Sequence, residues 1–196
     1  MPSVPASLRA QVTCLVSCLV TCLVLAGCGG RTPAARSPAP TVRSEIEQAE
    51  VAERARRHDV ARVHYERAIV SARDPASIAF ARRAYAETLA SWGEVAAAIM
   101  HLDVAVAAVP RDPGAWHDLG ILRHKQGDLG GAITALEHAR TLAPADYRPR
   151  VALAALRWKQ GDRAGAAAEY HGLLELELPD RLRAKVRWAL DELAKP

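Results

Sequence analysis

Seven histidines and four cysteines are the residues best suited to metal or nucleophilic chemistry. His117 and His124 lie seven residues apart, which places them on the same face of a helix but two turns apart. That separation is too long for one metal ion, because helical histidines that share a metal are usually four residues apart. Cys14, Cys18 and Cys22 recur within an apolar run, where cysteine acts as a small hydrophobic residue. The pattern therefore favours neither a metal site nor a redox cluster.

Sequence motifs of catalysis are also missing. The chain contains no glycine-rich phosphate loop and no G-x-S-x-G elbow, and no Cys-His pair follows the apolar run. We therefore predict a protein that is not an enzyme and that has no cofactor and no small-molecule substrate. A hydrolase or metalloenzyme is the alternative from another functional class, and metal analysis of the purified protein distinguishes it.

The first 27 residues have the organisation of an export signal. Arg9 is the only charged residue before Arg31, and residues 12–27 between them are almost wholly apolar or small. A bilayer-spanning helix needs about 20 apolar residues, whereas this run is shorter and ends in a Gly-Cys-Gly-Gly segment. We interpret residues 1–27 as a cleaved signal peptide. An uncleaved anchor and an ordinary secretory signal are the alternatives.

The end of this segment, Leu25-Ala26-Gly27-Cys28, resembles the bacterial lipobox. The resemblance implies that Cys28 is lipidated and becomes the first residue of the mature chain. Two or more acyl chains anchor a protein stably, because each buried methylene contributes about 0.8 kcal/mol. Gly29, where inner-membrane retention would favour Asp, implies sorting to the outer membrane in a cell that has two membranes. We expect a lipid-anchored protein of the bacterial cell envelope that faces the periplasm.

Residues 28–41 follow as a predicted flexible linker rich in Pro, Gly and Ala. Pro33, Pro38 and Pro40 disfavour a regular helix or strand there. At roughly 3.1 Å per residue in an extended state, this linker reaches about 40 Å. It would hold the folded part of the chain away from the lipid surface.

The rest of the chain repeats with a period of 34 residues. Gly93, Gly127 and Gly161 stand 34 residues apart (127 − 93 and 161 − 127). Two further sets share this interval: Ala98, Ala132 and Ala166, then Leu102, Leu136 and Tyr170. This period is the length of a helix-turn-helix unit that buries its apolar face only by stacking on copies of itself. The pattern predicts a repeat protein whose main activity is binding.

Residues 113–146 resemble the tetratricopeptide repeat, whose pattern is W-x2-L-G-x2-Y, then A-x3-F, then P. The matching residues are Trp116, Leu119, Gly120, Ala132, Leu136, Ala139 and Pro144. Gly120 and Ala132 are small where the two helices would lie closest, and Arg123 is a departure because the pattern has Tyr there. The resemblance implies an all-α fold: an α-solenoid of stacked antiparallel helix pairs, the tetratricopeptide superhelix, with a C-terminal capping helix.

The predicted units follow from this period. They are a degenerate first repeat at 42–78, three repeats at 79–112, 113–146 and 147–180, and a capping helix at 181–196. Ala61 and Ala98 are 37 residues apart, so we interpret Asp74-Pro75-Ala76-Ser77 as a longer turn before the second unit. In the last repeat, Leu178 replaces the expected proline. A generic four-helix bundle is the alternative, although it would not require small residues at a constant interval.

In tetratricopeptide arrays the first helix of each pair lines the inner groove. By this resemblance the partner-binding groove consists of Phe80, Arg83, Glu87, His117, Ile121, His124, Lys125, Arg148, Val151, Trp158 and Lys159. The apolar members would contact apolar side chains of a peptide, and the basic members would pair with its carboxylates. The alternative is that the basic residues form a solvated face and that Trp158 packs between repeats.

These observations also limit the choice of partner. A formal net charge of +4 is too small to indicate nucleic acid. The family's chaperone adaptors hold a carboxylate with Lys and Asn residues, but the sixth positions here are Ala84, Asp118 and Ala152. We expect a non-catalytic, membrane-anchored lipoprotein that acts as a protein–protein interaction scaffold or assembly factor for another envelope protein or peptide. An envelope ligand- or peptidoglycan-binding module, with its site near Trp158 and His124, is the second hypothesis.

Overall fold

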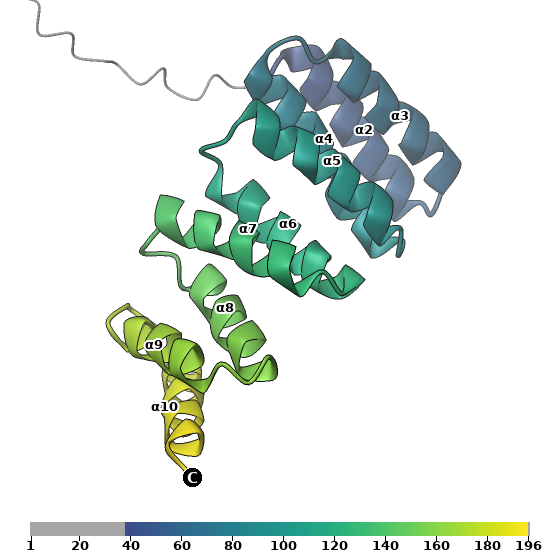
Figure 1. The fold of residues 1–196 in the computed structure, drawn as a ribbon. Coiled ribbons are helices and arrows are strands. Elements are labelled where there is room, and N and C mark those ends of the chain that lie inside the picture. The colour runs from purple at the N-terminus through teal and green to yellow at the C-terminus, as the bar shows by residue number, and fades with distance from the viewer. Residues whose placement is uncertain (1–37, 196) are drawn as a thin grey trace, which may run out of the picture. The chain divides into compact units, whose positions relative to one another are not determined.

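The computed structural model describes residues 38–195, and every regular element in this range is an α-helix (Figure 1). Cys28, the predicted signal peptide and most of the predicted linker lie outside the described residues. The helices are α2 (Pro40–Arg54), α3 (His58–Ser71), α4 (Pro75–Ser91), α5 (Val95–Ala108), α6 (Pro113–Gln126), α7 (Leu129–Leu142), α8 (Tyr147–Lys159), α9 (Arg163–Leu174) and α10 (Asp180–Ala194). None of these described helices is both long enough and apolar enough to span a bilayer.

Consecutive helices form hairpins that stack one on the next. The hairpins are α2–α3, α4–α5, α6–α7 and α8–α9, and α10 packs on α9 at the C-terminal end (Figure 1). Neighbouring hairpins meet where α3 contacts α4, α5 contacts α6 and α7 contacts α8. The first helices also touch directly, α2 with α4 and α6 with α8. The predicted α-solenoid with a C-terminal capping helix is confirmed.

The glycine repeat marks the same turn in three hairpins. Gly93, Gly127 and Gly161 have φ values of +86°, +96° and +82°, a left-handed conformation that is strained for residues with a Cβ. A Cβ would meet nothing within 4 Å at any of them, so the backbone conformation and not lack of space requires glycine. In the first hairpin Arg56 has a φ of +56° and lies 37 residues before Gly93. The first hairpin therefore has a left-handed residue in its turn without a glycine there.

Inside a hairpin, the small residues are needed for close approach of the helices. A Cβ on Gly120 would lie 2.6 Å from Leu136 Cγ and 3.1 Å from the Ala132 carbonyl oxygen. Ala132 and Leu136 are themselves fully buried. The sequence-based expectation that α6 and α7 are closest at Gly120 is confirmed.

Aspartate caps begin several helices. Asp112 accepts hydrogen bonds from the N–H groups of Gly114 and Ala115 at 2.9 and 3.2 Å, ahead of Pro113. Asp128 likewise accepts from the Gly131 N–H at 2.9 Å and caps α7. Both caps follow from the residue type, because Asp at the N-cap accepts from N–H groups that have no helical partner.

The same arrangement corrects our interpretation of the segment from Asp74 to Ser77. Asp74 accepts a hydrogen bond from the Ser77 N–H at 3.0 Å, and Pro75 is the first residue of α4. These residues form a cap and a first helical turn, not a longer turn between units. The three extra residues lengthen α4, which has 17 residues where α6 has 14. Pro40 likewise starts α2 inside the predicted linker, because the fixed φ of proline suits a first helical position.

The capping helix α10 covers the apolar side of the last repeat. Val186 is buried in a cluster with Leu173 and Leu178, so Leu178 contributes to the core where the family pattern has proline. Arg181, Lys185 and other charged residues lie on the opposite side. Trp188 is the exception there, since 62% of its surface is exposed.

A groove along the first helices

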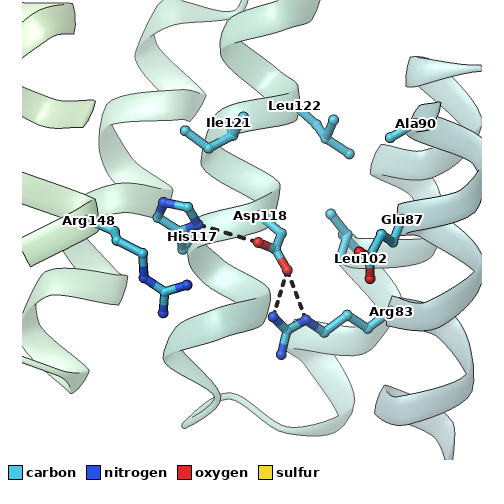
Figure 2. Close-up of a pocket in the computed structure, with 9 residues that line it drawn as sticks. All are labelled: Arg83, Glu87, Ala90, Leu102, His117, Asp118, Ile121, Leu122 and Arg148. Carbon is cyan, nitrogen blue, oxygen red and sulfur yellow. Dashed lines mark hydrogen bonds and ion pairs between the residues drawn. The ribbon is translucent and has the colours of Figure 1, made fainter. Parts of the chain in front are cut away.

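A cavity of about 390 Å³ lies between α4 and α6, and we call it the central cavity (Figure 2). Its lining comes from four helices: Arg83, Glu87 and Ala90 of α4, Leu102 of α5, His117, Asp118, Ile121 and Leu122 of α6, and Arg148 of α8. Residues four apart on a helix share one face. This spacing brings Glu87 beside Arg83 on α4, and Ile121 beside His117 on α6. Five of the eleven predicted groove residues therefore meet in the central cavity.

Arg83 is held by acidic residues of α6 and the turn before it. Its Nε and Nη2 atoms each lie 2.8 Å from Asp118 Oδ2 (Figure 2). Its Nη1 lies 3.7 Å from Asp112 Oδ2. A Cβ on Gly114 would come within 2.7 Å of Arg83 Nη1, so the glycine makes room for the guanidinium. Arg83 thus joins two repeats, and its charge is already compensated within the chain.

Asp118 stands at the centre of this arrangement, although the predicted groove did not include it. Burial raises the pKa of Asp118, but a hydrogen bond with His117 and the positive charge of Arg83 outweigh that effect and lower the pKa below its usual value. The His117 Nδ1 and Asp118 Oδ1 atoms are 3.3 Å apart. The side chain is therefore a carboxylate at neutral pH. Two signals in the sequence pointed to it: Asp118 directly follows His117, and it occupies the sixth position of its unit, which the family's chaperone adaptors use to hold a ligand.

Arg148 is also paired inside the chain. Its Nη2 lies 2.7 Å from Asp146 Oδ2, and its Nε bonds both Asp146 oxygens at 3.0 and 3.1 Å. This ion pair raises the pKa of Arg148 and lowers the pKa of Asp146. The predicted basic character is therefore absent from the central cavity, where Glu87 and Asp118 balance Arg83 and Arg148.

A second cavity of about 220 Å³, the α6–α8 cavity, adjoins the first and is mostly apolar. It is lined by Ile121 and His124 of α6 and by Ala152, Ala155, Leu156 and Lys159 of α8. Ile121 lines both cavities, so they are neighbours. The structure thus brings together two more predicted residues, His124 and Lys159.

A third cavity of about 300 Å³, the α2–α4 cavity, adjoins the central cavity on the other side through Glu87. Its lining is Glu50, Glu53 and Arg54 of α2, Tyr65 of α3, and Ala84, Glu87, Thr88 and Ser91 of α4. Sequence reasoning missed the contribution of α2. Subtracting the 37-residue spacing from Glu87, Ala90 and Ser91 gives Glu50, Glu53 and Arg54, so the signal was present. Together the three cavities form what we call the first-helix groove.

Four predicted residues lie elsewhere. Val151 packs on the apolar cluster beneath α10, and the Trp158 ring lies 6.1 Å from that of Tyr170 and 6.3 Å from that of Trp188. Trp158 therefore packs between the last hairpin and the capping helix, whereas the alternative interpretation placed it between repeats. Phe80 and Lys125 are exposed on α4 and α6 but line none of these three cavities.

No group of three or more His, Cys, Asp or Glu side chains within residues 38–195 is arranged to hold a metal ion. The two helical histidines have separate surroundings. His117 lies against Asp118, and His124 lines the α6–α8 cavity.

Comparisons with known proteins identify the fold that forms this groove. No protein-family model and no curated protein matches the chain. A crystal structure of MamA superposes with a TM-score of 0.62 at 21% identity, over 74% of this chain and 81% of MamA. The first tetratricopeptide domain of Spaghetti (RPAP3), bound to the HSP90 peptide SRMEEVD, gives 0.54 at 18% identity, over 60% of this chain and 94% of that domain. The chain has the tetratricopeptide-repeat fold. PilF of Pseudomonas aeruginosa gives 0.60 at 18% identity, over 78% of this chain and 67% of PilF.

Within this tetratricopeptide fold, Arg123 occupies the position where the repeat pattern has Tyr. Its Nη2 lies 2.8 Å from Asp103 Oδ1 on the preceding helix α5. One period later, Arg157 Nη2 lies 2.6 Å from Glu137 Oε1 on α7. Equivalent ion pairs therefore join neighbouring repeats at two successive boundaries, which explains why arginine replaces the tyrosine of the pattern.

Proposed function

We propose that this tetratricopeptide-fold chain is a non-catalytic scaffold that binds a protein partner through a peptide segment lying in the first-helix groove. The observation that carries the proposal is the row of three neighbouring cavities along the first helices, in which Glu87 lines two and Ile121 lines two. A groove that crosses four helices suits an extended segment better than a compact ligand. A solved structure with this fold holds a peptide, which supports the same mode of binding.

We further propose that the scaffold is anchored to a bacterial membrane through lipidated Cys28 and works in the cell envelope. The lipobox-like residues 25–28 and the linker after them support this part of the proposal. An outer-membrane location facing the periplasm follows from Gly29. The partner is then another envelope protein or an exposed segment of one, and the scaffold acts as its adaptor or assembly factor.

Crosslinking in intact cells tests the groove. Ile121 lines two of the cavities, so Ile121→Asp places a charge in the middle of the apolar surface and should abolish recovery of the crosslinked partner. Met100→Asp on α5 is the matched control, because Met100 is 69% exposed and lines none of the three cavities. Helicity of both variants, measured by circular dichroism, should equal that of the wild type. Equal recovery with both variants would place the partner on another surface.

The peptidoglycan-binding hypothesis required Trp158 and His124 to form one site. His124 lines the α6–α8 cavity, whereas Trp158 packs with Tyr170 and Trp188. A glycan site needs an aromatic face open to the sugar, and Trp158 is partly covered. The groove geometry therefore favours a peptide.

A further inference from the structure

We propose that the first-helix groove selects its peptide by the order of charges along it. The bound segment has basic residues at the end that lies over α2 and α4, large aliphatic residues over α6, and acidic residues at the end over α8. This inference rests on the proposed function and adds the chemistry of the partner to it.

The α2–α4 end of the groove is acidic. Glu50, Glu53 and Glu87 line it against a single cation, Arg54, which pairs with Glu50 at 3.2 Å. Glu53 accepts hydrogen bonds from Thr88 Oγ1 at 3.2 Å and Ser91 Oγ at 3.4 Å, so two hydroxyl groups fix its carboxylate. These bonds leave its negative charge uncompensated. In the described part of the chain Glu87 has no ion-pair partner.

The middle of the groove combines aliphatic surface with charges that balance. Ala90, Leu102, Ile121 and Leu122 line the central cavity together with the charged side chains of Arg83, Glu87, Asp118 and Arg148. Arg83 pairs with Asp118 and Arg148 pairs with Asp146, so the aliphatic side chains around Ile121 are what the α6 part of the groove offers to a partner. A leucine or isoleucine side chain of a peptide fits this environment.

The α8 end of the groove has the opposite sign. Lys159 lines the α6–α8 cavity opposite His124, and Lys125 is exposed one residue after His124. Neither lysine forms an ion pair within residues 38–195, so both are available to carboxylates of a partner. The rest of the cavity wall is isoleucine, alanine and leucine, so no carboxylate of residues 38–195 lines this cavity.

These two ends define a direction. Packed helices lie about 8–10 Å apart, so a path across four of them is on the order of 25–30 Å and holds about nine extended residues. Charges at the ends of such a segment are partly hydrated and add little affinity each, but a segment with the reverse order brings like charges together at both ends. Charge order therefore acts mainly by rejecting wrong segments.

Selection from a display library of random nine-residue peptides tests this inference. The full-length chain, purified in detergent, serves as the target. We expect enriched peptides to carry Lys or Arg at one end, Leu or Ile in the middle and Asp or Glu at the other end. A quadruple variant with Glu50→Lys, Glu87→Lys, Lys125→Glu and Lys159→Glu should enrich the reverse charge order. All four side chains are exposed, so the substitutions leave the core intact.

Fluorescence anisotropy with one enriched peptide gives the size of the effect. The Lys159→Glu and Glu87→Lys variants should each bind this peptide about fivefold or more weakly than the wild-type protein does, which is typical of one exposed pair replaced by a repulsion. Lys185→Glu on α10 and Glu66→Lys on α3 are controls with the same charge changes outside the groove. They should leave the affinity unchanged.

Two other results separate this inference from the proposed function. Enriched peptides without charge order that lose binding to Ile121→Asp would overturn the charge-order inference and leave the peptide-binding groove in place. Enriched peptides that bind Ile121→Asp as well as the wild type would overturn both.

Discussion

Two regions of this chain contain several charged residues, and they use them in opposite ways. In the first-helix groove, Glu87 and Lys159 face solvent without ion pairs in the described chain. At the boundary of α7, α8 and α9, Glu169 is only 2% exposed and is surrounded by three arginines. Arg140 bonds one of its carboxylate oxygens, Arg150 Nη1 lies 3.3 Å from the other, and Arg157 Nη1 lies 3.7 Å from Glu169 Oε1.

This difference separates charges that hold repeats together from charges that remain free to bind. One period before Glu169 stands Ala135, which is fully buried. The position equivalent to Glu169 in the preceding repeat is thus filled by a buried alanine. The cluster of charges around Glu169 is therefore specific to the last repeat. Removing one member of a buried ionic cluster costs much more than the pair contributes, because the remaining charges lose their partner. We expect large effects on stability at Glu169 and small ones in the groove.

The largest effect should come from Glu169→Ala. The variant leaves three partly buried arginines around an empty site, and the free energy of unfolding should fall by about 3 kcal/mol. Urea unfolding followed by circular dichroism measures the change. Glu137→Ala is the control, because Glu137 is 41% exposed and pairs with Arg157 alone, so its loss should cost under about 1 kcal/mol. Equal effects of the two substitutions would remove the distinction between the regions.

The second largest effect on stability should come from a change in apolar packing, which joins helices where the ionic cluster does not. Gly120→Ala puts a methyl group against Leu136 and should lower the free energy of unfolding by about 2 kcal/mol through overpacking. Gly130→Ala on α7 is the matched control, since its Cβ would meet only one atom, at 4.0 Å. That substitution should stabilise the chain by up to about 1 kcal/mol through helix propensity. A neutral Gly120→Ala would contradict the close approach of α6 and α7.

The third prediction concerns the pH dependence of stability at Asp118, which lines the groove but is paired with Arg83. The pKa of Asp118 is lowered in the folded chain, so its stabilising effect is complete above the unfolded value of about 3.9 and is lost as pH falls through the folded value. Asp118→Asn should therefore lose less stability than the wild type when the pH falls from 5 to 3. Because Asp118 is 40% exposed, the difference should be under about 1 kcal/mol.

Urea unfolding at several pH values measures this difference, and Asp191→Asn on α10 controls for removal of a surface carboxylate. Parallel pH profiles of the wild type and Asp118→Asn would show that the Arg83 pair does not persist in solution.

The smallest effects should be those of the groove charges on folding. Glu87→Lys and Lys159→Glu should each change the free energy of unfolding by no more than about 0.5 kcal/mol, because the side chains are exposed and unpaired. The same protein samples that show altered peptide affinity should unfold at unchanged urea concentrations. A loss of several kcal/mol would show that these charges have a structural role and would weaken their assignment to binding.

Local features of the fold were predictable from the sequence. The Asp112-Pro113 cap, the left-handed Gly127 and the small Gly120 each depend on neighbours in the same hairpin, so their residue types alone indicate their roles. Arg56 shows the limit of that approach. It adopts the left-handed conformation in the turn between α2 and α3 without being glycine, so its residue type gave no indication of the turn. The extra turn of α4 was missed for a similar reason, since Asp74 and Pro75 suit both a loop and a helix start.

For the groove, the resemblance of the sequence to tetratricopeptide repeats indicated that the first helix of each pair faces it. The constant period then picked out many of the side chains that α4, α6 and α8 present, because it puts equivalent positions on one side. It could not determine which of those charges are free. Arg83 and Asp118 are 35 residues apart, and Arg140 and Glu169 are 29 apart. Whether such side chains meet depends on how one hairpin is rotated against the next. Only the tertiary structure decided that Arg83 and Arg148 are paired within the chain, that Trp158 packs under the capping helix, and that Glu87 and Lys159 have no ion pair within residues 38–195.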